Sequence, residues 1–397
     1  MMSALPDTVS AGVVPRTLKL AVVTETYPPE INGVAMTVSR WLTELVERGH
    51  ELQLVRPRQP HDVPDHDSDY RQLTVPGLPI PLYSGLRLGL PVDVRLLRSW
   101  RQWRPDLVHI VTEGPLGASA LRVARRLGIP VSSGFHTNFH QYSHHYRLGW
   151  CRGAVIRYLR RFHNRCDLTL VPTAQLAGQL AEQGFANLQV IARGVDTRLF
   201  DPARRDPELR SAWGVVGPGP AVLYVGRLAA EKNIELAIKA FGTIRARCPG
   251  ARLILVGDGP MRDSLAERYP EFRFCGVQHG TRLAAHYASA DLFLFPSTTE
   301  TFGNVVLEAM ASALAVVAFD DAAARQFIVT GRNGVTVPLD DSSGFCDQAA
   351  RLAADPLRTR HYGHLARRTI ETVSWSTIGR QLESVFYQAI DPQGERL

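Results

Sequence analysis

The chain has 397 residues, of which 45% are hydrophobic and 21% are charged, so it is long enough for two domains and has the composition of a folded globular protein. Its formal net charge of +7 favours acidic partners such as nucleic acid, anionic lipid or a nucleotide diphosphate, and charge alone does not choose among them. The cysteines are scattered without a Cys-x-x-Cys pair, and no apolar run reaches the roughly 18–20 residues that span a bilayer; this argues against a disulfide framework, a zinc site and a transmembrane helix.

The first half of the chain alternates predicted strands with predicted helices. Residues 1–17 lack the basic start and apolar core of a secretory signal, and we expect them to form a loose extension. The patterns that follow predict strands at 18–23, 51–55, 107–111 and 131–135, and helices at 37–48 and 116–127. This alternation predicts a parallel sheet with helices on both faces.

The loop after the first strand is a candidate ligand site. It contains Asn32-Gly33-Val34 just before a helix. Gly33 would let the backbone approach a ligand closely, and the N–H groups at the start of the helix would point at that ligand. The loop has neither the nucleoside-triphosphatase pattern nor the dinucleotide pattern of glycines, and an ordinary Asn-Gly turn is the alternative.

Two basic segments in this half contain aromatic residues. Residues 94–104 combine Arg95, Arg98 and Arg101 with two tryptophans, and residues 147–165 have a similar composition. A basic amphipathic helix of this kind can lie on anionic lipid. The alternative is an aromatic stripe that faces the core under a solvated basic face, and the sequence leaves both readings open.

Two groups of polar residues are superficially similar to metal sites. His136 follows the strand at 131–135, and His140, His144 and His145 come soon after it, without Cys or carboxylate neighbours at ligand spacing. Four aspartates lie in a Pro-rich loop with no preceding apolar strand, and we expect a solvated loop there. These are Asp62, Asp65, Asp67 and Asp69. We therefore predict no metal site.

A Pro/Gly-rich stretch at 214–220 precedes a second alternating series. This series predicts strands at 221–225, 252–256, 291–295 and 315–319, with helices at 234–247, from about residue 303, and at 378–389. The domain boundary is expected between Val190 and Arg210. The predicted divisions are an N-terminal domain at 18–192, a C-terminal domain at 193–374 and a closing segment at 375–397.

Two loops of the second series carry candidate catalytic residues. Arg227 and Lys232 follow the strand at 221–225 and could neutralise a diphosphate, Arg as a planar fork and Lys as a point charge. Glu300 follows the strand at 291–295, and Glu308 lies on the helix that starts near Gly303. Free N–H groups between these glutamates favour an anion, while carboxylates can hold hydroxyl groups. Solvated surface residues are the alternative for both loops.

Together these segments resemble glycosyltransferase family 4, whose members are retaining enzymes with the GT-B fold. The resemblance lies in the Tyr-Pro-Pro…Asn32-Gly33-Val34 loop, Phe-His136-Thr-Asn, Gly-Arg227-Leu…Glu-Lys232-Asn and Glu300-x7-Glu308. It extends from Leu18 to about Ala389, and is nearest to the branch that contains GDP-mannose-dependent α-mannosyltransferases and glycolipid-forming enzymes.

The resemblance implies an α/β fold of two Rossmann-like doubly wound domains that face each other across a cleft, with the acceptor on the N-terminal domain and the nucleotide sugar mainly on the C-terminal one. It implies catalytic roles for Glu300, Arg227, Lys232 and His136, with Glu300 and His136 against the donor sugar and the two cations on the leaving phosphate. It implies donor binding by the remaining motif residues, among which Glu308 would hold the ribose. These are Asn32, Gly33, Val34, Gly303, Asn304, Val305 and Glu308.

The expected reaction is retaining transfer of a hexose, with mannose from GDP-mannose favoured, to a hydroxyl group of a membrane lipid or glycan. A UDP-sugar donor is the alternative, and a catalytically silent nucleotide- or carbohydrate-binding protein is the alternative of another class. A nucleic-acid partner is not expected, because no recognisable nucleic-acid-binding module is present. We expect no metal or other cofactor, and a cytoplasmic protein that is either soluble or peripheral at the inner face of the cell membrane.

One loop departs from the family pattern. Ala313 and Ala315 stand where a glycine and a proline are usual, and residues 322–326 replace a Gly-Gly…Glu stretch. Donor specificity is therefore not assigned from this loop.

Overall fold

The computed structural model describes residues 16–30, 32–59, 62, 69–79, 87–136, 151–215, 217 and 219–393, with only the backbone of 151 and 152. Several residues discussed above lie outside this set. They are residues 1–15, Asp65, Asp67, His140, His144, His145 and residues 147–150.

The first half of the chain forms a seven-stranded parallel sheet in the order β3-β2-β1-β6-β7-β8-β9. Lys19 of β1 lies opposite Glu51 of β2, and Leu20 of β1 lies opposite Leu107 of β6, which fixes the register at the centre. The strands are β1 (Lys19–Val23), β2 (Glu51–Pro57), β3 (Arg71–Val75), β6 (Leu107–Ile110), β7 (Val131–Gly134), β8 (Leu168–Val171) and β9 (Leu188–Val190). A separate antiparallel pair is formed by β4 (Gly77–Pro79) and β5 (Arg87–Gly89).

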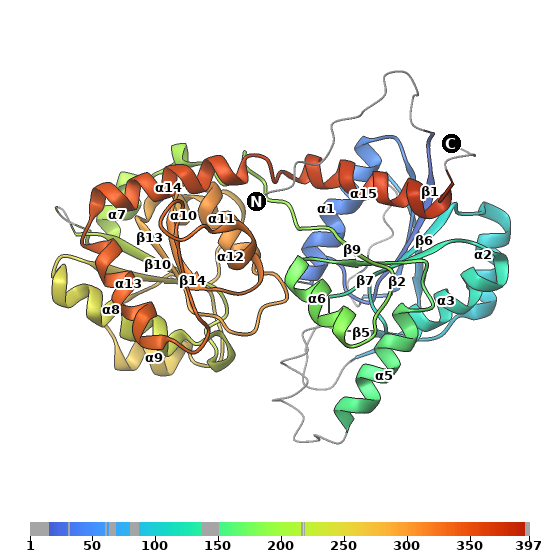
Figure 1. Ribbon diagram of the computed structural model, residues 1–397, viewed down its shortest axis with the longest axis horizontal. Helices are drawn as coiled ribbons and strands as arrows, with labels where there is room; N and C mark the ends of the chain where they lie inside the picture. Colours follow the sequence, from blue (N-terminus) through green and yellow to red (C-terminus); the bar gives the residue numbers. More distant parts are fainter. Residues whose placement is uncertain are drawn as a thin grey trace.

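Helices cover both faces of this sheet, as Figure 1 shows. Alternate residues of β1 point to opposite faces of the sheet. Leu20 therefore packs with α1 (Gly33–Glu47) and α15 (Trp375–Ile390), while Ala21 packs with α2 (Asp93–Trp103) and α3 (Pro115–Leu127). The helices of this half are α1 (Gly33–Glu47), α2 (Asp93–Trp103), α3 (Pro115–Leu127), α5 (Cys151–His163) and α6 (Ala174–Glu182).

The aromatic residues of the segment at 94–104 face the core. Trp100 is fully buried on α2 and donates a hydrogen bond from Nε1 to Gln53 Oε1 over 2.9 Å, and Trp103 is also buried. The membrane-facing reading of these tryptophans is therefore wrong, because the helix places them under its solvated basic face.

The second half forms a six-stranded parallel sheet in the order β12-β11-β10-β13-β14-β15. Its strands are β10 (Ala221–Val225), β11 (Arg252–Val256), β12 (Arg273–Phe274), β13 (Leu292–Phe295), β14 (Ala315–Phe319) and β15 (Val335–Val337). Its helices are η1 (Pro202–Arg204), α7 (Pro207–Ala212), η2 (Ala230–Lys232), α8 (Ile234–Arg247), α9 (Arg262–Arg268), α10 (Gly280–Ser289), α11 (Asn304–Ala311), α12 (Ala322–Phe327), α13 (Ser342–Ala353) and α14 (Pro356–Ile370). Two buried apolar clusters, one on each face, hold these helices to the sheet.

The chain crosses between the two sheets after β9 and returns after α14. The two crossing segments pair where Val195 N donates to Val373 O over 3.0 Å. The closing helix α15 (Trp375–Ile390) then packs on the N-terminal half beside α1 (Figure 1), and Glu383 of α15 contacts both His50 and Arg48. The domain limits drawn at 192/193 and 374/375 remain a prediction, which these two crossings support.

The strand order places the ligand loops at two switch points. In the first sheet, β2 and β3 are added on one side of β1, and β6 and the strands after it are added on the other side. In the second sheet, β11 and β12 lie on one side of β10, and β13 to β15 lie on the other. The switch points are therefore between β1 and β6 and between β10 and β13. Loops that leave adjacent strands at such a point diverge and leave a crevice at the carboxyl ends of the strands. The loops after β1, β6, β10 and β13 are therefore the ones that the fold makes available to a ligand.

Among the described residues, no helix combines the length and the apolar character that crossing a membrane requires.

Candidate active site

A cavity of about 670 Å³ lies between the two sheets and is lined by loops from both. Most of the residues predicted to act on a donor line it, whereas Arg227 and Glu308 do not. The predicted residues in its wall are Asn32, Gly33, Val34, His136, Lys232, Glu300, Gly303, Asn304 and Val305. They are joined there by Thr26, Val111, Thr112, Glu113, Arg193, Tyr224, Val225, Gly226, Phe295, Thr299, Thr301 and Phe302.

The N-terminus of α1 is capped by its own preceding residue. Asn32 Oδ1 accepts hydrogen bonds from Val34 N over 3.0 Å and from Ala35 N over 2.9 Å. This side-chain cap satisfies two N–H groups that a helix start otherwise leaves free. The Val34 N–H group therefore already has a partner, and a phosphate could reach it only if Asn32 moved.

The N-terminus of α11 has a different arrangement. Gly303 precedes the helix with a φ of 91°, and no side chain of the described residues caps the first turn. A Cβ at Gly303 would lie 3.3 Å from the Phe295 ring, so both the positive φ and the lack of space favour glycine here. The uncapped first turn opens onto the cavity and provides a positive helix end for an anion.

Glu300 and Lys232 form an ion pair at the edge of the cavity. Lys232 Nζ lies 2.5 Å from Glu300 Oε1, and Ser297 Oγ donates to the same oxygen over 2.8 Å. Lys232 ends the short helix η2 after β10, and Glu300 lies in the loop after β13, so the neighbouring strands bring the two residues together. The pair leaves Glu300 Oε2 as the carboxylate oxygen that can accept hydroxyl groups from a sugar.

Arg227 points away from this pair. Its side chain is 59% exposed and forms an ion pair with Glu231 over 3.1 Å. The predicted contact of Arg227 with a leaving phosphate requires a different side-chain orientation, and it remains a prediction.

His136 contacts the loop that carries Glu300. Its carbonyl oxygen accepts a hydrogen bond from Thr301 Oγ1 over 3.4 Å, which links the two halves of the chain across the cavity. Neither ring nitrogen has a hydrogen-bond partner among the described residues. Burial holds the pKa of His136 well below its ordinary value, with the positive charge of Arg193 adding to the effect, so the ring is neutral at pH 7.

Glu308 lies farther along α11 and accepts a hydrogen bond from Tyr287 Oη over 2.9 Å. Burial raises the pKa of Glu308 to about 7, and the Tyr287 hydroxyl opposes this rise. Its predicted contact with a ribose therefore starts from a carboxyl group that is partly protonated at neutral pH.

The sequence interpretation did not include two charged residues of the cavity wall. Glu113 follows β6 at the switch point, and its Oε1 lies 3.1 Å from Nε2 of the buried His163. Its position in the loop after a buried strand could have indicated it. Arg193 follows β9 on the crossing segment and is 5% exposed. No local signal distinguishes it, because its surroundings come from both halves of the chain.

Glu25, in the loop after β1, is half-buried and interacts electrostatically with Glu113. Its carboxylate accepts a hydrogen bond from Leu116 N over 3.1 Å. Burial raises the pKa of Glu25 to about 7, and the negative charge of Glu113 adds to the rise. Of these two carboxyl groups, only that of Glu113 lines the cavity. Among the described residues, no three His, Cys, Asp or Glu side chains are grouped so that they could hold a metal ion.

Comparison with known proteins identifies the family to which the chain belongs. Residues 31–199 match the family model described as Glycosyltransferase Family 4, and residues 219–355 match the model described as Glycosyl transferases group 1. The chain is 35% identical over 370 residues to a GDP-mannose-dependent alpha-mannosyltransferase of Mycolicibacterium smegmatis, a match that covers 92% of this chain and 96% of that protein.

A more distant relative and a solved structure extend the comparison. The chain is 28% identical to an alpha-monoglucosyldiacylglycerol synthase of Streptococcus pneumoniae, over 76% of this chain and 71% of that one. The fold is similar to that of a sucrose-phosphate synthase from Thermosynechococcus elongatus, with a TM-score of 0.77 and 20% identity over 95% of this chain and 100% of that chain. The two domains of parallel sheets are those of the GT-B fold.

Proposed function

Because the chain belongs to glycosyltransferase family 4 and is a hexosyltransferase, we propose that it moves mannose from GDP-mannose to a hydroxyl group of a membrane lipid or glycan, and that the new bond has the α configuration. The observation that carries the proposal is the convergence of Lys232, Glu300 and the uncapped start of α11 on one cavity. A cavity of about 670 Å³ is of the size that binds a nucleotide-sized ligand.

The proposed chemistry assigns a separate task to each part of the site. As the bond between the sugar C1 and the phosphate oxygen breaks, its electron pair stays on that oxygen and the sugar ring becomes positively charged. Lys232 and the start of α11 stabilise the negative charge of the departing phosphate. The acceptor hydroxyl attacks C1 from the same face, and its proton goes to the departing phosphate oxygen, so the configuration at C1 is retained.

Glu300 and His136 would orient the sugar. The Glu300 oxygen that Lys232 leaves open can accept sugar hydroxyls, and the neutral His136 ring offers one donor and one acceptor. A double displacement would need a carboxylate nucleophile near C1. Lys232 and Ser297 already hold one oxygen of Glu300, so we favour the same-face route.

The choice of mannose and GDP rests on the mannosyltransferase relatives, and the choice of a lipid or glycan acceptor rests also on the glycolipid-forming relative. A UDP-sugar remains the alternative donor. A catalytically silent binding protein is not retained, because the family match and the mannosyltransferase relatives identify an enzyme.

The N-terminal half offers one surface for a lipid acceptor. On α5 the side chains of Arg157, Arg160 and Arg161 are exposed beside Tyr158, whereas Phe162 is buried. We propose that this basic face meets anionic lipid at the inner face of the cell membrane.

The proposed transfer reaction needs no metal ion, since cationic groups of the protein would supply the positive charge that stabilises the departing phosphate.

A donor-by-acceptor screen tests the function. The purified chain is incubated with GDP-mannose, UDP-glucose and UDP-galactose, each with glycolipid vesicles or soluble glycans, and release of the nucleoside diphosphate is measured with and without a chelator. We expect release from GDP-mannose with lipid present, insensitivity to the chelator, and an α linkage by NMR of the product. Release from UDP-sugars alone would favour the alternative donor, and a β linkage would contradict retention.

A further inference from the structure

Arg193 lies where the two halves of the chain meet, and the family motifs described above do not include it. It follows β9 on the crossing segment, two residues before Val195 pairs with the returning chain. Its side chain is buried and lines the cavity.

The guanidinium group sits between the starts of two helices. Arg193 Nη1 lies 3.5 Å from Gly33 O and 3.3 Å from Asn304 Oδ1, and these two residues are the first residues of α1 and α11. A Cβ at Gly33 would lie 3.1 Å from the same nitrogen, so the absence of a side chain there admits the arginine. The guanidinium carbon also lies 5.5 Å from the centre of the Phe302 ring.

This placement is electrostatically unfavourable in the free protein. A helix start carries a partial positive charge, so a cation beside two helix starts is repelled by both. Burial lowers the pKa of Arg193 to about 10, opposed by the negative charge of Glu300, so the group still carries its charge at pH 7. Among the described residues, no carboxylate lies within ion-pair distance of Arg193, and its Nε has no hydrogen-bond partner.

The other cations of the site differ from Arg193 in this respect. Lys232 is paired with Glu300, and Arg227 is paired with Glu231. Arg193 is therefore the cation in the described cavity wall that has no carboxylate at ion-pair distance.

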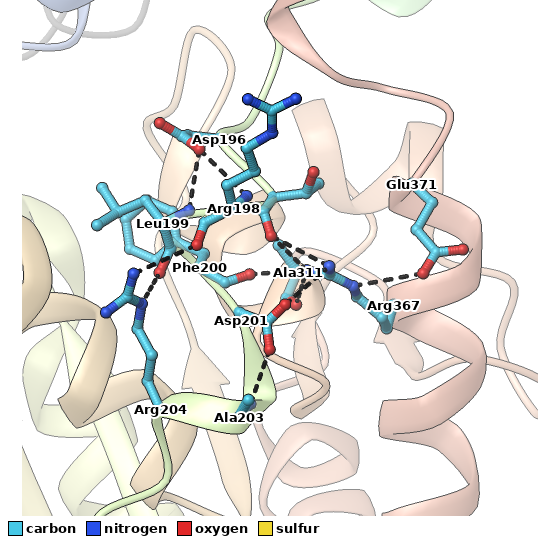
Figure 2. A network of polar contacts seen from close by, with 11 residues as sticks. Asp196, Arg198, Leu199, Phe200, Asp201, Ala203, Arg204, Ala311, Arg367 and Glu371 are labelled. Carbon is cyan, nitrogen blue, oxygen red and sulfur yellow. Dashed lines mark hydrogen bonds and ion pairs between the residues drawn. The ribbon is translucent and has the colours of Figure 1, made fainter.

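A half-buried arginine near the same crossing segment, Arg367, serves as an example of a structural role. Arg367 of α14 donates to the carbonyl oxygens of Thr197, Phe200 and Ala311, and contacts the carboxylates of Asp201 and Glu371 (Figure 2). All three of its nitrogens have partners, so its burial is compensated within the protein. Among the described residues, Arg193 makes only two hydrogen bonds; both are long, both go to neutral oxygens, and both come from one nitrogen.

We propose that Arg193 binds the diphosphate group of the nucleotide sugar at the junction of the α1 and α11 helix starts. A diphosphate there would neutralise the guanidinium and the uncapped start of α11, and Arg193 would stabilise the negative charge that the leaving phosphate gains as its bond to C1 breaks. The inference rests on the proposed function and adds a cation to its donor site.

The test compares Arg193→Met and Arg193→Lys with the native chain. Binding of GDP, UDP, their monophosphates and their nucleosides is measured by calorimetry, and thermal unfolding is measured without ligand. A charged hydrogen bond is worth roughly 1.5–3 kcal/mol, so we expect Arg193→Met to weaken diphosphate binding by about 10- to 100-fold. Nucleoside binding should stay unchanged, and Arg193→Lys should lose less than Arg193→Met.

The thermal stability of the free variants distinguishes a diphosphate-binding role of Arg193 from a structural role. Replacing an uncompensated buried charge by an apolar side chain is neutral or stabilising, so the Tm of free Arg193→Met should equal or exceed that of the native chain. Arg367→Met is the matched control and should lower Tm while keeping the ratio of diphosphate to nucleoside affinity. If Arg193→Met lowers Tm and keeps that ratio, Arg193 is a structural clamp and the inference is wrong.

The two proposals fail in different ways. If the native chain binds a diphosphate and releases it from a sugar donor, yet Arg193→Met binds the diphosphate equally well, only the role of Arg193 is overturned. If the native chain binds no nucleotide and consumes no donor, the proposed function is overturned, and the role of Arg193 with it.

Discussion

Lys232 Nζ lies 2.5 Å from Glu300 Oε1, and this contact joins the loop after β10 to the loop after β13. The two loops leave neighbouring strands at the switch point of the second sheet. In the proposed mechanism, Lys232 would orient the carboxylate that holds the sugar and would also supply positive charge near the departing phosphate.

Replacement of Lys232 by alanine should remove both the partner that orients Glu300 and the positive charge near the departing phosphate. We expect kcat/KM to fall by about 10²-fold or more, because a preorganised charge partner is typically worth a few kcal/mol in the transition state. Initial rates of nucleoside diphosphate release give the measurement. Lys239→Ala, which changes an exposed lysine on α8, is the control and should keep native kinetics. A loss of less than twofold for Lys232→Ala would contradict the assignment.

Glu308→Gln should change how stability depends on pH. The pKa of Glu308 rises from an ordinary 4.5 to about 7 in the folded chain. Between these two values the folded chain keeps a proton that the unfolded chain has released, so the native protein loses stability as the pH rises through this window. Glutamine carries no such proton. Urea unfolding from pH 5 to pH 8 should therefore show the variant gaining stability relative to the native chain, and parallel curves would argue against the raised pKa.

Ala313→Gly should stabilise the chain. Ala313 has a φ of 57°, which costs an L-residue roughly 1–2 kcal/mol, whereas glycine adopts it freely. Part of this gain is offset because glycine makes the unfolded chain more flexible, so we expect a net gain of about 0.5–1 kcal/mol in the free energy of unfolding. The control is Ala285→Gly inside α10, which should cost about 1 kcal/mol. Equal effects of the two substitutions would contradict the backbone argument.

The basic face of α5 should govern membrane binding. We expect the triple change of Arg157, Arg160 and Arg161 to glutamine to weaken binding to anionic vesicles by about 100-fold at low salt, at about 1 kcal/mol for each basic residue near the surface. Vesicle co-sedimentation at two salt concentrations provides the measurement.

A charge-matched control for this change lies on α2. Arg95, Arg98 and Arg101 are exposed there, above tryptophans that face the core. Their replacement by glutamine should have a much smaller effect on vesicle binding. If both triple variants bind equally well, net charge rather than the α5 surface determines the attraction.

Local sequence patterns were enough for much of the fold. The bounds predicted for β10, β11, β14 and α8 agree with the structure, because buried parallel strands are continuous apolar runs and α8 has a clear start and end. The family and its GT-B fold followed from short motifs in the loops after the strands. The start of α1 was placed four residues late, since Asn32 caps the helix at Gly33 and the predicted helix began at Thr37.

The sequence by itself thus determined the parallel α/β architecture, the family and the loops that line the cavity, because each of these depends on residues close together in the chain. Tertiary structure alone decided which charges face one another. The hydrogen bond between Glu308 and Tyr287, the core position of Trp100 and the place of Arg193 between two helix starts all depend on segments distant in sequence. Burial and electrostatic fields are sums over such neighbours, and a local pattern does not contain them.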